Sequence, residues 1–137
     1  MTVINKKAIA LSILKDEIEG DLLSALSKLH PDYSMTWMYK GKTLFPRETF
    51  KNPDEGKKIY EIKGRKYDIK NIAETKNVVF IELVESYPDL KTKRVYRTPL
   101  VLVLEFQNGK IRRGRHYCDP KISYLHLTGS QIKKAMK

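Results

Sequence analysis

Apolar residues near the start of the chain recur at steps of three and four, the spacing of one face of a helix. This spacing predicts an amphipathic helix over about residues 3–19, and Gly20 is a suitable residue to end it. Asp21 can cap a second helix, which should end at His30 and Pro31 because the residue before a proline avoids helical geometry. The positions that form the apolar stripe are Ile4, Ala8, Leu11, either Leu14 or Lys15, Ile18 and Leu22.

The next segment predicts a strand, because apolar and polar residues alternate there. Residues 33–39 are rich in aromatic side chains. Since successive side chains of a strand point to opposite faces, Tyr33, Trp37 and Tyr39 should share one face.

The middle of the chain predicts further strands separated by loops. Strands are expected over about residues 58–63, 66–75 and 77–86. The prolines between residues 43 and 56 indicate a loop with one short helix within residues 43–50, and residues 87–90 should form a turn or a bulge.

The stretch 94–119 predicts two long strands joined by a turn at Asn108 and Gly109. The first strand is apolar from Leu100 to Leu104, whereas the second alternates and divides its residues between two faces. One face should carry Arg113, Arg115, Tyr117 and Asp119, and the other Arg112, Gly114, His116 and Cys118. Helices first and long strands afterwards are typical of an α+β domain with an antiparallel sheet.

The length of 137 residues suits a single domain. No apolar run reaches the ~18 residues that a membrane span needs. Cys118 is the single cysteine, which rules out an internal disulfide and favours a reducing compartment. We therefore predict a cytoplasmic protein without a membrane partner.

The formal net charge of +11 is the most unusual global property of the chain. Such a charge suits nucleic-acid binding, but it also suits a solvated, lysine-rich surface. The basic residues are scattered, and the sequence contains no helix-turn-helix, zinc-finger or RNA-recognition motif. Nucleic acid therefore remains an alternative partner that rests on the net charge alone.

Three features together resemble a known family. They are the paired helices before the run Tyr33–Trp37, the turn segment Val101–Ile111, and the strand ending Arg115–Asp119. This order of elements is similar to the nuclear transport factor 2-like superfamily, in its SnoaL-like branch. The resemblance covers nearly the whole chain.

The resemblance implies a cystatin-like cone, in which a strongly bent antiparallel sheet wraps around two or three N-terminal helices and encloses a pocket. Family members often form homodimers through the sheet. They include polyketide cyclases, a steroid isomerase, an epoxide hydrolase, dehydratases and a transport factor without catalysis, so the fold leaves the function open. We expect a single SnoaL-like domain over residues 1–137, with a core at about 5–125 and a short basic tail.

The resemblance also places one histidine in the pocket. In the cyclase and epoxide-hydrolase relatives, the catalytic aspartate lies five residues after the turn motif, and counting five residues from Ile111 gives His116. Since an imidazole is a competent general base at neutral pH, His116 is a candidate catalytic residue. The alternatives are contact with a ligand, or a structural hydrogen bond to Tyr33, Tyr39 or the backbone.

The remaining candidates surround this histidine. Asp119 matches the terminal aspartate of the family and is a weaker catalytic candidate. Glu82 lies within an apolar run, so it is either an inward carboxylate with a partner or an exposed residue. Gly114 and Cys118 are small and would leave room for a ligand. The expected ligand-binding residues are Tyr33, Trp37, Tyr39, Glu82, Gly114, His116 and Cys118.

No metal and no cofactor is predicted. His30, His116 and His126 lack cysteine or acidic companions at metal-ligand spacing, and the sequence has no glycine-rich nucleotide motif. The leading hypothesis is a domain that binds a small, largely apolar molecule in its cone. The alternatives are an isomerase, cyclase or dehydratase with His116 as general base, and a non-catalytic module for association with protein or nucleic acid.

Overall fold

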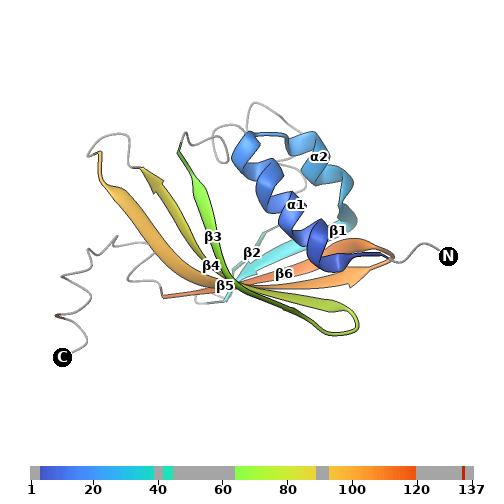
Figure 1. The fold of residues 1–137 in the computed structure, drawn as a ribbon. Coiled ribbons are helices and arrows are strands. Elements are labelled where there is room, and N and C mark those ends of the chain that lie inside the picture. The colour runs from blue at the N-terminus through green and yellow to red at the C-terminus, as the bar shows by residue number, and fades with distance from the viewer. Residues whose placement is uncertain (1–3, 39–41, 45–63, 89–92, 120–133, 135–137) are drawn as a thin grey trace.

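The computed structural model describes residues 4–38, 42–44, 64–88, 93–119 and 134. Its elements form two layers, with a pair of helices lying across one face of a curved sheet (Figure 1). In chain order they are α1 (Lys6–Glu19), α2 (Leu22–Ser27), β1 (Leu29–Trp37), β2 (Lys42–Leu44), β3 (Lys66–Glu74), β4 (Val78–Pro88), β5 (Val95–Gln107) and β6 (Lys110–Cys118).

Local signals set both ends of α1, and the sequence predicts the end at Gly20. The side chain of Asn5 accepts a hydrogen bond from the backbone N–H of Ala8 at 3.0 Å and caps the first turn. Gly20 ends the helix in the left-handed conformation, with φ of 74°. The side chain of Asp21 then caps α2 by accepting from the N–H of Ser24.

The predicted end of α2 is wrong. The helix stops at Ser27, and β1 already begins at Leu29. His30 and Pro31 therefore lie in a strand, because extended geometry satisfies the restriction that Pro31 places on His30. The partner that fixes this strand is remote in sequence, since Leu29 lies beside Ile111 of β6.

The sequence predicts the buried face of α1 only in part. Leu11 and Ile18, two members of the predicted stripe, are exposed at the surface, whereas Leu14, an alternative member, is buried. The buried apolar residues of α1 are Ala10, Ile13 and Leu14, so the face toward the sheet is rotated from the predicted stripe and shares only Leu14 with it. Both stripes satisfy the helical period, and only the position of the sheet distinguishes them.

The described strands form one six-stranded sheet in the order β2-β1-β6-β5-β4-β3. The expected α+β cone is confirmed, but the sheet is mixed, because β1 runs parallel to β6. The other neighbouring pairs are antiparallel. A parallel pair requires a long connection between its strands, and here β2 to β5 lie between them in sequence.

Two predicted loop segments contribute to this sheet. Tyr87 and Pro88 continue β4 and pair with β5, where the sequence predicted a turn. Thr43 and Leu44 lie in β2, where a loop was expected. The expected strands at 66–75 and 77–86 are confirmed as β3 and β4. The short helix predicted within residues 43–50 is not formed at Thr43 and Leu44, and its remaining residues lie outside the described part of the chain. The predicted strand at 58–63 and, apart from residue 134, the C-terminal tail also lie outside it.

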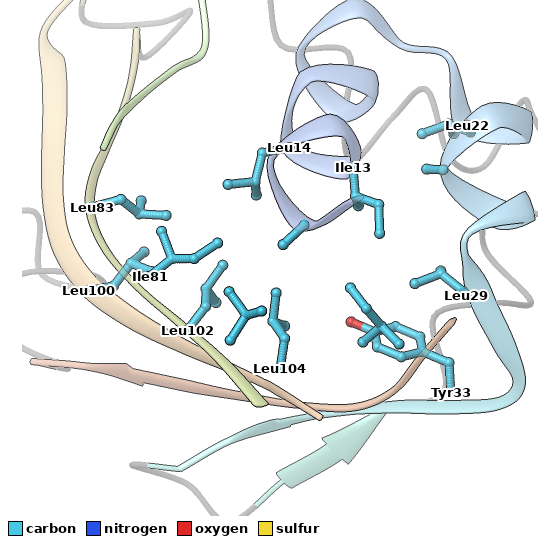
Figure 2. Close-up of a cluster of buried hydrophobic side chains, with 14 residues drawn as sticks. Ile13, Leu14, Leu22, Leu29, Tyr33, Ile81, Leu83, Leu100, Leu102 and Leu104 are labelled. Carbon is cyan, nitrogen blue, oxygen red and sulfur yellow. The ribbon is translucent and has the colours of Figure 1, made fainter. Parts of the chain in front are cut away.

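The core fills the space between α1 and the concave face of the sheet. Figure 2 shows Ile13 and Leu14 pointing from the helix toward the side chains of Ile81, Leu83 and Leu102. Ile81 is fully buried and Leu83 nearly so, and burial of one such side chain contributes about 1.5–3 kcal/mol. Neither helix in the described part of the chain is long and apolar enough to cross a membrane.

A bulge in the last hairpin changes which residues of β6 face the core. Glu105 pairs with Arg113 and Phe106 with Ile111, so Arg112 is the extra residue on β6. Arg112 was predicted on the face of His116. Its guanidinium instead donates to the side chain of Gln107 at 3.1 Å.

Replacing Gly109 by alanine should lower the free energy of unfolding by about 1–2 kcal/mol, because residue 109 has a φ of 76°, where a Cβ is strained. The new Cβ would also lie 2.7 Å from Cδ1 of Ile4. Denaturant unfolding measures the loss. Asn108→Gly, at the neighbouring turn position with φ of 52°, is the matched control and should be nearly neutral. Equal stability of Gly109→Ala and wild type would contradict the assigned turn.

Candidate functional site on the concave face

Trp37 and His116 form a stacked pair on the concave face. They are register partners on the parallel strands β1 and β6, and their ring centroids lie 5.9 Å apart with an interplanar angle of 29°. Leu102 is the partner of His116 on the other side and is buried in the core. His116 therefore points inward, on the same side of the sheet as the core.

The imidazole of His116 has an unmet hydrogen-bonding group. Its Nδ1 atom is buried and has no hydrogen-bond partner in the part of the chain that the structure describes. Burial lowers the pKa of His116, because the charged imidazolium loses its hydration. At neutral pH the ring is therefore neutral, with one nitrogen able to accept a proton or a hydrogen bond.

Gly114 and Tyr33 have packing roles. A Cβ at Gly114 would lie 2.6 Å from Cε of Met35, so Met35 occupies the space beside this glycine. The sequence predicted that this space would serve a ligand. Tyr33 is buried in the main core cluster, whereas Cys118 is a free, half-buried thiol packed at its edge.

Two predicted site residues lie away from the Trp37–His116 pair. Glu82 is exposed on the convex face, where its carboxylate accepts a hydrogen bond from Nδ2 of Asn71 at 2.7 Å. Its neighbours Ile81 and Leu83 take the inward positions of this strand. Asp119 is exposed just after the end of β6. Tyr39 lies outside the described residues.

A second polar group occupies the concave face beside the C-terminal half of α1. We call Glu17, Arg65, Tyr67 and Glu85 the four-residue cluster. The Tyr67 hydroxyl donates to Oε2 of Glu17 at 3.0 Å. A guanidinium nitrogen of Arg65 lies 3.4 Å from Oε1 of Glu85. Tyr67 and Glu85 are register partners, which places the group at one end of the sheet.

Burial shifts the protonation of this cluster. It raises the pKa of Glu17 from 4.5 to about 7, against the opposing effects of the Tyr67 hydrogen bond and the positive charge of Arg65. Burial also raises the pKa of Glu85, and Arg65 again opposes the shift. The pKa of Tyr67 is raised in turn by burial and by the two carboxyl groups. Glu17 therefore changes charge near neutral pH.

Sequence reasoning missed the four-residue cluster. Glu17 follows Leu14 by three residues and Ala10 by seven, so it belongs to the stripe that faces the sheet. A carboxylate on a buried stripe is a recognisable signal, but the predicted stripe shared only Leu14 with the buried face and did not include Glu17. Arg65 and Tyr67 share a face through simple alternation, which by itself does not show which face is inward.

An apolar belt separates the cluster from the Trp37–His116 pair. Leu83 and Leu100 are register partners, and Leu100 in turn pairs with Cys118. The concave face thus presents two polar groups with apolar side chains between them. Among the described residues, no group of three His, Cys, Asp or Glu side chains lies close enough to hold a metal ion.

The three arginines of β6 are engaged in ion pairs. Arg113 and Arg115 lie 3.8 Å and 3.2 Å from the carboxylate of Glu105 on the neighbouring strand. Arg112 lies 3.6 Å from the carboxylate of Asp32. These three arginines are therefore engaged with carboxylates of the same sheet and do not form an unpaired basic stripe of the kind that follows a nucleic-acid backbone.

No family model and no curated protein matches the sequence. Solved structures do match the fold. A protein from Shewanella putrefaciens assigned as a SnoaL-like polyketide cyclase is 12% identical, with a TM-score of 0.70 and coverage of 96% of each chain. An NTF2-like protein of unknown function from Cytophaga hutchinsonii is 14% identical, with a TM-score of 0.68 and coverage of 90% of this chain and 97% of that one.

A third match is a protein from Catenulispora acidiphila with a ketosteroid isomerase-like fold, solved with trimethylamine. It is 15% identical, with a TM-score of 0.66 and coverage of 80% of this chain and 83% of that one. The chain therefore has the nuclear transport factor 2-like fold, as the resemblance of its sequence implied. Identities this low define the fold and leave the activity open.

Replacing Glu17 by glutamine should flatten the dependence of stability on pH. Because the folded pKa of Glu17 is about 7 and the unfolded value is 4.5, its stabilisation is complete below the unfolded pKa and is lost as the pH rises through the folded pKa. Between pH 4.5 and about 7, the free energy of unfolding of the wild type should fall by on the order of 3 kcal/mol at most relative to that of Glu17→Gln. Denaturant unfolding at several pH values measures the difference.

The difference between the two stability curves reports on Glu17, because the raised pKa of Glu85 and the lowered pKa of His116 contribute to the pH dependence of both proteins. Glu82→Gln, which alters a carboxylate on the convex face, should follow the wild-type curve. Parallel curves for wild type and Glu17→Gln would show that Glu17 has an ordinary pKa.

Proposed function

We propose that this protein binds a small, largely apolar molecule on its concave face, beside Trp37 and His116. The observation that carries the proposal is the inward stacked pair, in which the buried Nδ1 atom of His116 has no partner among the described residues. An aromatic wall next to one well-placed polar atom is the usual composition of a small-molecule site. Buried polar atoms are normally satisfied, so this position favours a hydrogen-bonding group of a ligand or an ordered water.

The comparisons support this proposal at the level of the fold. One further match, TerC, was co-crystallised with polyporic acid; it is 17% identical, with a TM-score of 0.69. The protein from Catenulispora acidiphila is in complex with trimethylamine. Small molecules therefore accompany two of the solved proteins that share this fold.

The single tryptophan of the chain provides a direct assay, because Trp37 belongs to the proposed site. Cyclic alcohols and ketones that do not absorb where tryptophan is excited should shift the emission of Trp37 to shorter wavelength, since a bound apolar molecule excludes water from the ring. His116→Ala should weaken the binding of these probes about 3- to 10-fold, the effect of one lost hydrogen bond. Fluorescence titration measures both effects.

His30→Ala is the matched control, because His30 also lies on the sheet but bonds to the backbone of Asp32. It should bind the probes as wild type does. The proposal fails if no probe alters the emission of Trp37, or if His116→Ala and His30→Ala bind equally well.

A second candidate function is acid–base catalysis with His116 as general base. The observation that favours it is the lowered pKa, which keeps the imidazole neutral and able to take a proton from a bound molecule. Isomerisation, cyclisation and dehydration all begin with such a transfer. Once a substrate is identified, His116→Ala should abolish turnover while binding is weakened only moderately. Full turnover by that variant would eliminate this function.

We further propose that two copies of the chain associate through the convex face of the sheet. Phe80 and Tyr117 are 40% and 43% exposed, and both project from central strands on the side opposite to the core. Exposed aromatic residues on a sheet face are typical of a protein interface.

Phe80→Glu should therefore convert a dimer to a monomer, because a carboxylate would lose its hydration in the interface. Light scattering coupled to gel filtration measures the mass. Leu23→Glu, at an exposed position of α2, is the matched control and should remain dimeric. A monomeric wild type, or a dimeric Phe80→Glu variant, would contradict this interface.

A further inference from the structure

The two halves of the concave face differ in how tightly they are covered. Helix α1 packs over β3 and β4, where the Tyr67 hydroxyl bonds to the end of the helix and Ile81 is fully buried. On β1 and β6, in contrast, Met35, Trp37 and His116 are half-buried. Solvent therefore reaches the side chains of this second half, and a small molecule has access to them.

The residues of this accessible half form two neighbouring pairs. Met35 is the register partner of Gly114, and Trp37 is the register partner of His116. Residues two apart on a strand point to the same face and lie about 7 Å apart. Met35 and Gly114 are therefore the next pair along the concave face from the stacked rings.

Gly114 leaves a gap in this surface, and the end of Met35 fills it. A Cβ at residue 114 would lie 2.6 Å from Cε and 2.9 Å from Sδ of Met35, so the thioether lies across the glycine. Another nearby atom, Cδ2 of Leu104, would be 3.4 Å away, which is ordinary van der Waals contact. The gap exists because residue 114 has no side chain, and its contents depend on the conformation of Met35.

Met35 is suited to leave this place. A methionine side chain is unbranched and has three rotatable bonds, so it changes rotamer without movement of the backbone. Met35 is half-buried and packs at the edge of the main core cluster, so its end can turn toward solvent. The departure costs the dispersion contacts of the thioether, and an apolar group that takes its place restores them.

We propose that the gap beside Gly114 is a second compartment of the same ligand site, and that Met35 turns aside to admit a branched alkyl group to it. The proposal rests on the proposed function, because the same molecule bonds to His116. Since the two positions lie about 7 Å apart, the ligand is a neutral alcohol or ketone with its oxygen at one end and the alkyl group at the other. Met35 is thus the residue that determines which ligand shape the site accepts.

Two isomeric probes test the proposal: trans-4-tert-butylcyclohexanol and trans-2-tert-butylcyclohexanol. They contain the same groups, but only the 4-isomer places the hydroxyl and the tert-butyl group at opposite ends of the ring. Titration of the Trp37 emission of the full chain should show at least about threefold tighter binding of the 4-isomer, because it alone buries its alkyl group while it bonds to His116. The ratio of the two affinities within one protein is the readout, so a change in overall stability does not alter it.

Met35→Ala should raise this ratio by a further factor of about 5 to 10, because the compartment then stands open and no side chain has to leave it. The double variant Met35→Ala/Gly114→Ala places a methyl group in the gap without the contact to Met35. Its ratio should lie at least about twofold below that of Met35→Ala, since the methyl group takes up part of the space.

Met38→Ala is the matched control, because Met38 is exposed just after the end of β1 and should keep the wild-type ratio. Equal binding of the two isomers to the wild type, or an unchanged ratio in Met35→Ala, would overturn the compartment while leaving apolar binding intact. Binding of cyclohexanol but of neither isomer would do the same. Failure of all three alcohols to bind would overturn the proposed function as well.

Discussion

The fold and both polar groups depend on the packing of α1 against the concave face of the sheet. Ile13 and Leu14 point from the helix into a surface built by Ile81, Leu83 and their neighbours on β5. A sheet face this apolar must be covered, and a bent sheet can wrap around one helix and bury it along its length. The bulge in β6 adds to this curvature, because a bulged strand bends.

The same packing decides the chemistry of the concave face. The stripe that buries Ile13 and Leu14 continues to Glu17, and so brings a carboxyl group against Tyr67. Burial that stabilises the apolar part of the interface raises the pKa of this carboxyl, because the charged form loses its hydration there. The apolar packing between α1 and the sheet therefore holds Glu17 in a place where its carboxyl group titrates near neutral pH.

Polar side chains have different surroundings on the two faces of the sheet. On the convex face, Glu82 bonds to Asn71 and Glu105 pairs with two arginines, so partners meet across neighbouring strands. On the concave face, His116 and Arg65 each keep one buried nitrogen without a partner among the described residues. Unpaired buried groups are uncommon in folded proteins and concentrate at functional sites. The concave face is therefore where ligand recognition is proposed.

The sequence by itself determined the features that depend on near neighbours. Asn108 and Gly109 set the hairpin turn, and Gly20 ended α1, because positive φ angles favour these residues wherever the turn lies. The tertiary structure alone decided which stripe of α1 is buried, the parallel pairing of β1 with β6, and the meeting of Glu17 with Tyr67. These depend on contacts between residues far apart in the chain, for which local periodicity gives equally good alternatives. His116 depends on both the sequence and the fold. Its position on the last strand could be predicted by counting residues from Ile111, whereas its contact with Trp37 is decided by the tertiary structure.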